Sequence, residues 1–468
     1  MKTLKQVFLL SLLLPLLLVA CKQNPKEDRE KQTPNIEEYK TEFIRDQLII
    51  LFKPEATADQ RKLLIDEFIK TGGKARKCHN CEDAFVLIEQ EGVHRYIENH
   101  AERLISNPSS TKAVAEDSIA YYSVNFRGHS PENNVRENEA RIDFKIPTVR
   151  DEDRAEEVVV AVLDTGVDKG IFPDAYLWKN TEENISNGCY GGDKEGWNFI
   201  GSGSADIQDD HAYRHGTLVN SYILEQFLNS KRRVALMNIK VLDENGSGDL
   251  FGLICGLHYA KDHGADIINI SLGFYEYDYQ NGNVHPYLQD LITNQLRKAG
   301  ILVVAAAGNR IPDNDQIFLS VFPGLNPRDI GQHRFYPAHL SNANGPAESN
   351  LLSVTTVGIK EGRVSPSQNY SPIHVDLGIG ADFIRQDSSF RFMLPFSNVN
   401  NGDIAGSSFA AAIATGRIGA YLPISVMNDI PVHTKSTLIG AIDQQIPFGV
   451  LTPSQGVQVQ QNRYLTRN

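Results

Sequence analysis

The 468-residue sequence lacks several features that mark common protein classes. It has no long run of lysine or arginine, and its formal net charge is −12, so we expect no nucleic-acid partner. After the first 20 residues, no apolar run is long enough to cross a bilayer. No internal repeat is evident, which argues against a repeat array. What remains is an ordinary globular composition, 41% hydrophobic and 22% charged, in a chain longer than a typical single domain.

The N-terminus has the composition of an export signal. Lys2 and Lys5 precede a short apolar stretch at residues 7–20, which ends in Ala20 immediately before Cys21. The letters L-V-A-C resemble the lipobox of bacterial lipoproteins, whose cysteine carries the lipid. The alternative is an ordinary secretory signal with an incidental cysteine. We expect residues 1–20 to be a signal peptide, Cys21 to anchor the chain in the membrane of a bacterial cell envelope, and residues 21–45 to be a flexible tether.

Cysteine is scarce, with five in all. Cys78 and Cys81 form a single C-x-x-C motif without a second copy, which is weak support for a zinc or redox site. In an exported protein the simpler expectation is a local disulfide between these two. Cys255 lies in an apolar segment that should be a buried helix, so we expect a small core residue there. Cys189, in a Gly-rich loop, has no assigned role.

A small domain is predicted at residues 46–126. Short apolar runs alternate with helical periodicity, and Thr57 is suited to cap the first helix. The predicted strands are 47–52, 84–89 and 118–124, and the predicted helices are 57–70 and 93–104. This order is typical of a small α+β module. The polar stretch at 127–155 is expected to be an exposed linker.

A second, larger domain is predicted at residues 156–468. Its continuous apolar, β-branched runs are typical of strands that are covered on both faces. Predicted strands at 158–163, 233–241, 265–272, 301–306 and 351–357 alternate with predicted helices at 216–228, 249–263 and 287–299. The order predicts an α/β fold, a doubly wound, mostly parallel sheet with helices on both faces. Functional residues are therefore expected beyond the carboxyl ends of its strands.

Four polar signals lie at such element ends. Asp164 follows the first strand, where a buried carboxylate needs a partner, although an Asp-Gly turn would also explain it. His215 begins a helix whose dipole opposes its protonation, as suits a general base, or it merely starts the helix. Ser408 follows Gly406 at the start of an Ala-rich helix, where its N–H could bind an oxyanion, or it is a simple N-cap. Asn309 follows another strand and could supply a second oxyanion donor.

Two histidines also have a spacing that metal sites use. His211 and His215 are four residues apart, but the zinc-protease motif HExxH requires a glutamate where Ala212 stands. We therefore assign no metal ligands.

Together, the motifs V-L-D-T-G-V-D, H-G-T-x-V, S-L-G, A-A-G-N and G-S-S-F-A resemble those of the subtilisin-like serine proteases, over residues 156–465. The resemblance implies a catalytic triad of Asp164, His215 and Ser408, with Asn309 as an oxyanion donor. It implies a substrate-binding edge made of Ser271, Leu272, Gly273, Ala307 and Gly308.

The resemblance further implies a serine endopeptidase that acts on peptides or proteins. The module at 46–126 resembles the family's propeptide, which would make the chain its own early partner and predicts autoprocessing between residues 122 and 146. No cofactor is required, although structural calcium is common in the family, with loops at Asp209 and Asp243 as candidates. The alternatives are a catalytically silent binding lipoprotein and a processing protease with narrow specificity.

Some positions depart from the family pattern. Leu218 and Ala412 replace a usual histidine and proline on helices behind the site, where we expect altered packing and retained catalysis. Phe274 replaces a usual glycine and is expected to narrow or cap the specificity pocket. Arg310, at the pocket rim, suggests a modest preference for an acidic or polar residue before the scissile bond.

Overall fold

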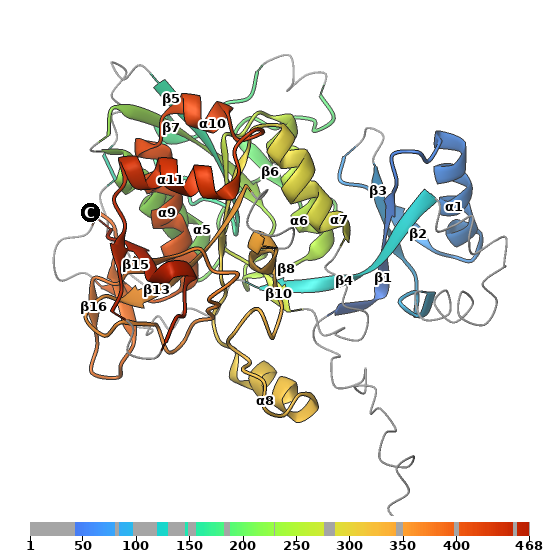
Figure 1. The fold of residues 1–468 in the computed structure, drawn as a ribbon. Helices are drawn as coiled ribbons and strands as arrows, with labels where there is room; N and C mark the ends of the chain where they lie inside the picture. Colours follow the sequence, from blue (N-terminus) through green and yellow to red (C-terminus); the bar gives the residue numbers. More distant parts are fainter. Residues whose placement is uncertain are drawn as a thin grey trace, which may run out of the picture. The chain divides into compact units, whose positions relative to one another are not determined.

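The computed structural model describes residues 43–79, 84–96, 119–129, 146–147, 156–181, 188–228, 230–275, 286–342, 350–396, 402–452 and 456–467 (Figure 1). All of these residues belong to one compact unit, Lys40–Asn468. The predicted signal peptide, the lipidation site Cys21 and most of the helix predicted at 93–104 lie outside the described residues. Within the described part of the chain, no helix is both long enough and apolar enough to span a bilayer.

The N-terminal module is an antiparallel sheet with one helix packed on it. Its strand order is β2-β3-β1-β4, and its elements are β1 (Phe43–Phe52), α1 (Ala58–Lys70), β2 (Lys74–Arg76), β3 (Phe85–Glu89) and β4 (Ala120–His129). Thr57 caps α1 in a capping box, in which its hydroxyl accepts the Gln60 N–H and the Gln60 side chain accepts the Thr57 N–H. The three predicted strands and the first helix are confirmed, and β2 was not predicted. β4 continues to His129, beyond the predicted boundary at residue 126.

The large domain is built on the predicted parallel sheet. Its strand order is β19-β20-β15-β13-β11-β9-β5-β7-β6. The bounds are β5 (Glu156–Asp164), β6 (Gly196–Asn198), β7 (Arg232–Lys240), β9 (Ile267–Ile270), β11 (Leu302–Ala306), β13 (Leu351–Gly358), β15 (Leu377–Gly380), β19 (Gly449–Val450) and β20 (Arg463–Leu465). Every neighbouring pair along this order is parallel except β19 and β20. The α/β fold class is therefore confirmed.

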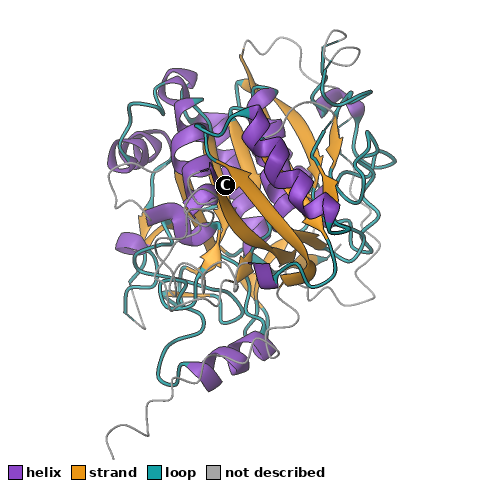
Figure 2. Ribbon diagram, turned by 90° about the vertical axis from the view of Figure 1, so that its right-hand side faces the viewer, coloured by secondary structure: helices purple, strands orange, loops and turns teal. Residues whose placement is uncertain are grey.

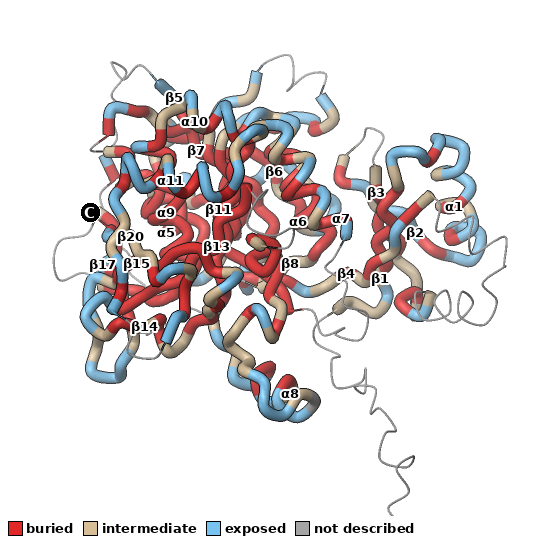
Figure 3. The backbone as a smooth tube through the Cα atoms, in the orientation of Figure 1, coloured by how far each residue is buried: buried red, intermediate tan, exposed pale blue. Residues whose placement is uncertain are grey.

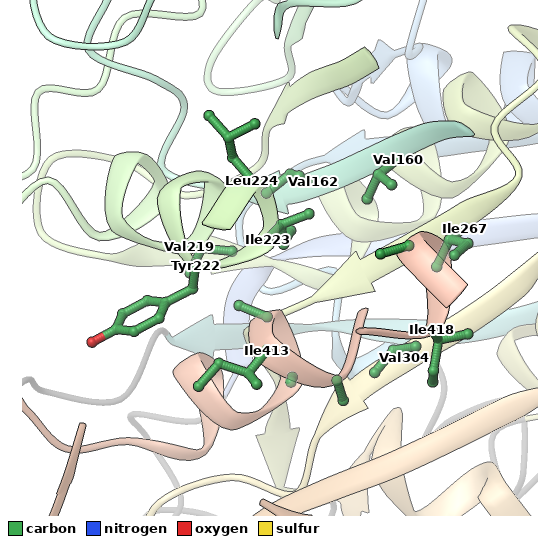
Figure 4. Close-up of a cluster of buried hydrophobic side chains, with 14 of the residues drawn as sticks. Val160, Val162, Val219, Tyr222, Ile223, Leu224, Ile267, Val304, Ile413 and Ile418 are labelled. Atoms are coloured by element: carbon green, nitrogen blue, oxygen red, sulfur yellow. The ribbon is translucent and has the colours of Figure 1, made fainter. Parts of the chain in front are cut away.

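Helices cover both faces of this sheet (Figure 2). The longer ones are α5 (His215–Leu228), α6 (Leu250–Asp262), α9 (Ser407–Tyr421) and α11 (Lys435–Gln445), with short helices α7 (Pro286–Asp290) and α10 (Ile424–Asn428). A further helix, α8 (Pro312–Val321), projects away from the sheet (Figure 1). Val160 and Val162 of β5 belong to the core cluster that α5 and α9 complete (Figure 4). Leu163 points the other way, because side chains alternate along a strand, and lies against α6 at Gly256.

The pair α5 and α9 is buried almost completely (Figure 3). Small residues allow the two helices to approach closely. A Cβ at Gly416 would lie 2.6 Å from the Ile223 carbonyl oxygen, and one at Gly419 would lie 2.7 Å from the Phe227 ring. The Ala-rich sequence of α9 is thus required by close packing, and that packing brings the start of α9 beside the start of α5.

Candidate active site

The structure brings two of the predicted catalytic side chains into contact and a third nearby. Asp164 ends β5, His215 begins α5 and Ser408 is the second residue of α9. The Asp164 carboxylate oxygen Oδ1 lies 2.7 Å from His215 Nδ1 and also accepts the Thr165 N–H at 2.7 Å. All three side chains are closed to solvent. An aspartate hydrogen-bonded to Nδ1 leaves Nε2 as the nitrogen that can accept a proton.

The hydrogen bond between Ser408 and His215 is not formed. Ser408 Oγ donates to the Ser271 carbonyl oxygen at 3.1 Å, and His215 Nε2 has no partner among the described residues. The imidazole packs against the Phe409 ring, with the centroids 5.3 Å apart. A serine hydroxyl can turn about one bond, and catalytic hydrogen bonds are often loose before substrate binds.

A buried polar network fixes the start of α5 next to Asp164. The Asp209 carboxylate accepts hydrogen bonds from the Thr165 hydroxyl and from the N–H and hydroxyl of Thr217. The Thr165 hydroxyl accepts the Gly216 N–H at 2.8 Å. Burial raises the pKa of Asp209, although these hydrogen bonds oppose the shift. From the sequence, Asp209 was predicted only as a possible calcium ligand, and its role in positioning α5 was not predicted.

A second network joins α9 to β9. The Ser271 hydroxyl donates to the Ser408 carbonyl oxygen at 3.1 Å and accepts from the Asn269 amide at 2.9 Å. The Thr415 hydroxyl donates to the Asn269 side-chain oxygen at 2.9 Å. Asn269 and Thr415 were not identified from the sequence, because each is one polar residue within an apolar element. Their partners are what give them a role.

Asn309 is oriented by the start of α9. Its side-chain oxygen accepts both the N–H and the hydroxyl of Ser407, each at 3.0 Å. Because a backbone N–H can only donate, the amide oxygen must face it, which leaves the Asn309 NH₂ to donate elsewhere. The first N–H groups of a helix are likewise without intrahelical acceptors, and Ser408 is one of these residues. Gly406, with φ of 152°, makes the turn into the helix.

The predicted substrate edge is occupied by a strand of the N-terminal module. His129 of β4 exchanges two backbone hydrogen bonds with Gly273, at 3.1 and 3.4 Å. On its other side the end of β4 pairs with β8 (Ser247–Asp249), with Gly128 opposite Gly248. β4 thus runs antiparallel to both segments, as an extended peptide would.

The two specificity residues have partners of their own. The Arg310 guanidinium lies 2.5 Å from the Asp315 carboxylate, so its charge is compensated and does not support a preference for an acidic substrate residue. The Phe274 ring is buried and stacks on Phe126 of β4 and on Tyr336, with centroids 5.1 and 5.6 Å away.

The predicted local disulfide between Cys78 and Cys81 was wrong. Cys78 forms a disulfide with Cys255, which is 177 residues away in sequence, and not the local bridge expected from C-x-x-C. The fold brings the end of β2 to α6, and that proximity has no local sequence pattern. Cys255 is buried, as predicted, but it is not a free core thiol. Cys189 is disulfide-bonded as well.

The calcium candidates find no support among the described residues, where no cluster of three or more His, Cys, Asp or Glu side chains could hold a metal ion. Asp209 is bound by the network described above. The Asp243 carboxylate closes its own turn by accepting the N–H groups of Asn245 and Ser247, both at 2.9 Å. Calcium binding stays a prediction.

Comparison with known proteins identifies the family. Residues 155–442 match the model of the Subtilase family. The chain is 32% identical over 262 residues to the major intracellular serine protease of Bacillus subtilis (strain 168), covering 53% of this chain and 74% of that protein. It is 25% identical over 333 residues to a subtilisin-like protease of Coccidioides posadasii (strain C735), covering 68% of this chain and 66% of that protein.

Other relatives are longer, and solved structures support the fold. The chain covers 26% of subtilisin-like protease 10 of Trichophyton verrucosum (strain HKI 0517). The crystal structure of fervidolysin from Fervidobacterium pennivorans, described as a keratinolytic enzyme related to subtilisin, aligns with a TM-score of 0.50 and 14% identity. That alignment covers 91% of this chain and 60% of fervidolysin, and it indicates the shared fold. The family match over residues 155–442, on this fold and with these side chains at its strand ends, means that the chain belongs to the subtilase family.

Proposed function

We propose that the chain is a serine endopeptidase that hydrolyses peptide bonds through Asp164, His215 and Ser408. The observation that carries the proposal is the buried contact of 2.7 Å between the Asp164 carboxylate and the His215 ring, beside a serine at the start of a helix. An unpaired buried carboxylate would be costly, and this one orients an imidazole instead of stabilising a fixed cation.

The mechanism is acyl transfer to water. Ser408 Oγ attacks the peptide carbonyl carbon while His215 Nε2 takes the hydroxyl proton, and Asp164 stabilises the imidazolium that forms. The Ser408 N–H and the Asn309 NH₂ hold the oxyanion, each contributing roughly 3 kcal/mol to the transition state. His215 then gives its proton to the leaving amine, and water, activated in the same way, hydrolyses the acyl-enzyme.

The N-terminal module acts as a propeptide in this proposal. The end of β4 already lies in the groove as a substrate would, through the two hydrogen bonds between His129 and Gly273. Antiparallel partners advance in opposite directions, so a residue about two positions after His129 would face Ser271, next to Ser408. Self-cleavage is expected there, within the window 122–146. N-terminal sequencing of the mature protein tests the position, and a start before residue 130 would contradict it.

The export proposal rests on the N-terminal sequence. Signal cleavage before Cys21 and acylation of its thiol would tether the enzyme to the cell envelope, so that the membrane becomes a partner through the lipid. The intact mass of the purified protein reports both events. A mass that includes residues 1–20, or that lacks added acyl chains, would reject lipid anchoring.

Replacing the nucleophile tests the enzyme. Ser408→Ala should reduce peptide turnover by roughly 10⁴-fold or more. It should lower the free energy of unfolding by only about 1 kcal/mol, because it removes one buried hydrogen bond, from Ser408 to the Ser271 carbonyl oxygen. Ser407→Ala is the matched comparison: it leaves the nucleophile and keeps the Ser407 N–H on Asn309, losing only the second of the two hydrogen bonds that orient Asn309, so its activity should fall far less. A fluorophosphonate probe should label the wild type and Ser407→Ala, but not Ser408→Ala. Turnover by Ser408→Ala would refute the assignment, and a folded wild type that neither cleaves nor reacts would favour the silent binding protein.

A further inference from the structure

An aromatic ring packs against the two backbone segments beside Asn309. A Cβ built on Gly273 would lie 2.4 Å from two ring atoms of Phe335, and one built on Gly308 would lie 2.7 and 2.8 Å from the same atoms. The ring edge therefore touches both glycine backbones at once. Phe335 is only 5% exposed. These two glycines belong to the segments 271–273 and 307–309, which follow neighbouring strands β9 and β11.

The space between these two segments is where a substrate side chain would have to enter. A peptide that continues the pairing of His129 with Gly273 brings one residue opposite Ser271, whose carbonyl oxygen accepts the Ser408 hydroxyl. That residue supplies the carbonyl to Ser408, and the same carbonyl must reach the Asn309 NH₂. Its side chain therefore enters the space between the two segments, toward Phe335.

The ring is held firmly in place. β12 (Phe335–Tyr336) pairs with β10 (Phe274–Tyr275), and the Tyr275 ring meets Phe335 edge-on at 4.9 Å. The Tyr275 hydroxyl accepts the Asn369 NH₂ at 2.8 Å and donates to the Asn309 carbonyl oxygen at 3.4 Å. The wall of this space is thus tied to the residue that carries the oxyanion donor.

From this packing we infer that Phe335 restricts the residue before the scissile bond to a small side chain, glycine, alanine or serine. The inference rests on the proposed peptidase function. Phe335 was not predicted from the sequence; the residues predicted to set specificity were Phe274 and Arg310, which have the partners described above.

The test compares peptides that differ only at this residue. We expect the wild-type chain to cleave after alanine at least tenfold more efficiently than after phenylalanine, measured as kcat/KM. Phe335→Ala should reverse that order, because the site discriminates by the size of the side chain that fits it, and removal of the ring makes room for phenylalanine. Phe318→Ala is the matched control, since it removes a buried ring that stacks on His333 at 4.2 Å. It should keep the wild-type order.

The outcomes separate the two proposals. All assays are run with and without dithiothreitol, and the fluorophosphonate probe counts active sites. Active wild type that cleaves equally well after phenylalanine would overturn the role of Phe335 and leave the peptidase function intact. A folded chain that reacts with neither peptide nor probe would overturn both. If Phe335→Ala does not fold, the wild-type preference alone decides.

A second observation, the disulfide, carries an independent inference. Cys78 follows β2 in the N-terminal module and Cys255 lies in α6 of the large domain, so their bond joins the two. We propose that a cut in the connecting segment does not release the module, which stays covalently attached as a second chain. Any cut between residues 78 and 255 leaves both fragments on the same disulfide.

Other contacts hold the module at the same place. The Asn125 side-chain oxygen accepts the Phe251 N–H at 2.9 Å, and the Phe85 ring packs on Phe251 and His258 at 5.7 and 5.1 Å. Arg76 lies 3.7 Å from Asp249, beside the pairing of β4 with β8. Covalent attachment makes rebinding intramolecular, so β4 competes with substrates for the groove even after the chain is cut. The device is a retained inhibitor that a thiol reductant would free, as the disulfide becomes two thiols and the reductant a disulfide.

The linkage is tested without the chain's own activity. A Ser408→Ala chain with a site-specific protease sequence inserted in 131–145 is cut by that protease, alkylated with iodoacetamide and run on a denaturing gel. All of these chains also carry Cys189→Ser, which removes the disulfide formed by Cys189. We expect one band without dithiothreitol and two with it. Adding Cys255→Ser should give two bands without reductant, whereas two bands in the Cys189→Ser background alone would overturn the linkage.

The regulatory consequence has its own readout. In the cut chain with Ser408 restored, dithiothreitol should raise peptide turnover about tenfold or more. The cut Cys189→Ser, Cys255→Ser chain should be active without it. Equal turnover of the cut Cys189→Ser chain with and without reductant would show that the attached module does not inhibit, and would overturn the proposed device.

Discussion

The N-terminal module and the large domain bury their apolar surface in different ways. In the large domain, the central strands and the helices α5 and α9 contribute side chains to one continuous core. In the module, α1 buries only Leu64 and Phe68 against one face of the sheet. The other face, which includes Ile49 and Leu51, is equally buried.

Contacts of Phe85 show what the second face depends on. Phe85 pairs with Leu51 across β1 and β3, on the face opposite α1, and its ring packs on Phe251, His258 and Tyr287 of the large domain. The large domain therefore supplies its own core, whereas the module borrows part of its core from the domain that it covers. Such dependence agrees with the propeptide role proposed above for the module.

The largest effect on stability is expected from a variant that disrupts a buried ion pair in the large domain. Lys435 Nζ lies 2.6 Å from the Asp376 carboxylate, and both side chains are inaccessible to solvent. Burial disfavours both charges, so it raises the pKa of Asp376 and lowers that of Lys435 despite their attraction. Lys435→Ala leaves the buried Asp376 carboxylate without its counter-charge, with only the Ser353 N–H still donating to it, and should cost about 3–5 kcal/mol of unfolding free energy in urea.

Two variants sharpen this test. Lys435→Met combined with Asp376→Leu should recover most of the loss, because no charge is then buried. Lys261→Ala removes one partner of a partly exposed pair, 3.7 Å from Asp262, and should change stability by less than about 1 kcal/mol. A Lys435→Ala protein as stable as the wild type would show that water reaches Asp376.

Removing the shared aromatic contact would test the dependence of the module. Phe85→Ala should cost about 3 kcal/mol, because the cavity lies between the module and α6. The loss should appear as faster trypsin cleavage within the module, while the large domain keeps its unfolding midpoint. Leu63→Ala, at a position 64% exposed on α1, is the control and should have little effect. Equal destabilisation of both parts would contradict the comparison.

The parts of the fold that could be predicted from the sequence are those that have a core of their own. The central strands were predicted because strands buried on both faces are continuous apolar runs, as in residues 158–163 and 351–357. Strands such as β15, with the sequence L-G-I-G, and the two-residue β19 carry no such signal and were missed. The end of β4 reads as polar linker, because its partners are β8 and Gly273 and it has no core face of its own.

The residues of the site also fall into a group that could be predicted and a group that could not. Residues within short motifs, such as Asp164 and Ser408, could be assigned from the resemblance. Residues that act through distant partners could not, because Asp209 is linked to Thr165 and Asn269 to Thr415 only by the fold. The disulfide was mispredicted for this reason: spacing in C-x-x-C favours a local bridge, whereas Cys255 lies 177 residues away.

Acid should weaken the junction between module and domain through His258. Burial, with the nearby charges of Lys261 and His79, lowers the pKa of His258 to about 3. The unfolded chain binds this proton near pH 6.5, so the stabilising neutral form is favoured above pH 6.5 and stability falls as the pH decreases toward 3. Between pH 7 and 5 the loss from this residue should be roughly 2 kcal/mol.

The matched variant is His258→Phe, which keeps a ring against Phe85 and removes the titration, at the cost of the hydrogen bond to the Tyr287 hydroxyl. The difference in unfolding free energy between pH 7 and pH 5 should shrink in this variant relative to the wild type. An unchanged pH dependence would mean that His258 binds its proton equally well in the folded and in the unfolded chain.

The smallest expected effect concerns the module alone, at the start of α1. Thr57→Ala removes the hydroxyl that accepts the Gln60 N–H at 3.3 Å, half of the capping box, and should cost about 1 kcal/mol. Thr57→Ser keeps the acceptor oxygen and should cost much less. Because α1 is mostly exposed and covers only one face of the module, the loss should be confined to the module, read as faster amide exchange in α1. If Thr57→Ala also lowered the unfolding midpoint of the large domain, the two parts would stabilise each other in both directions, and the one-sided dependence inferred from Phe85 would have to be abandoned.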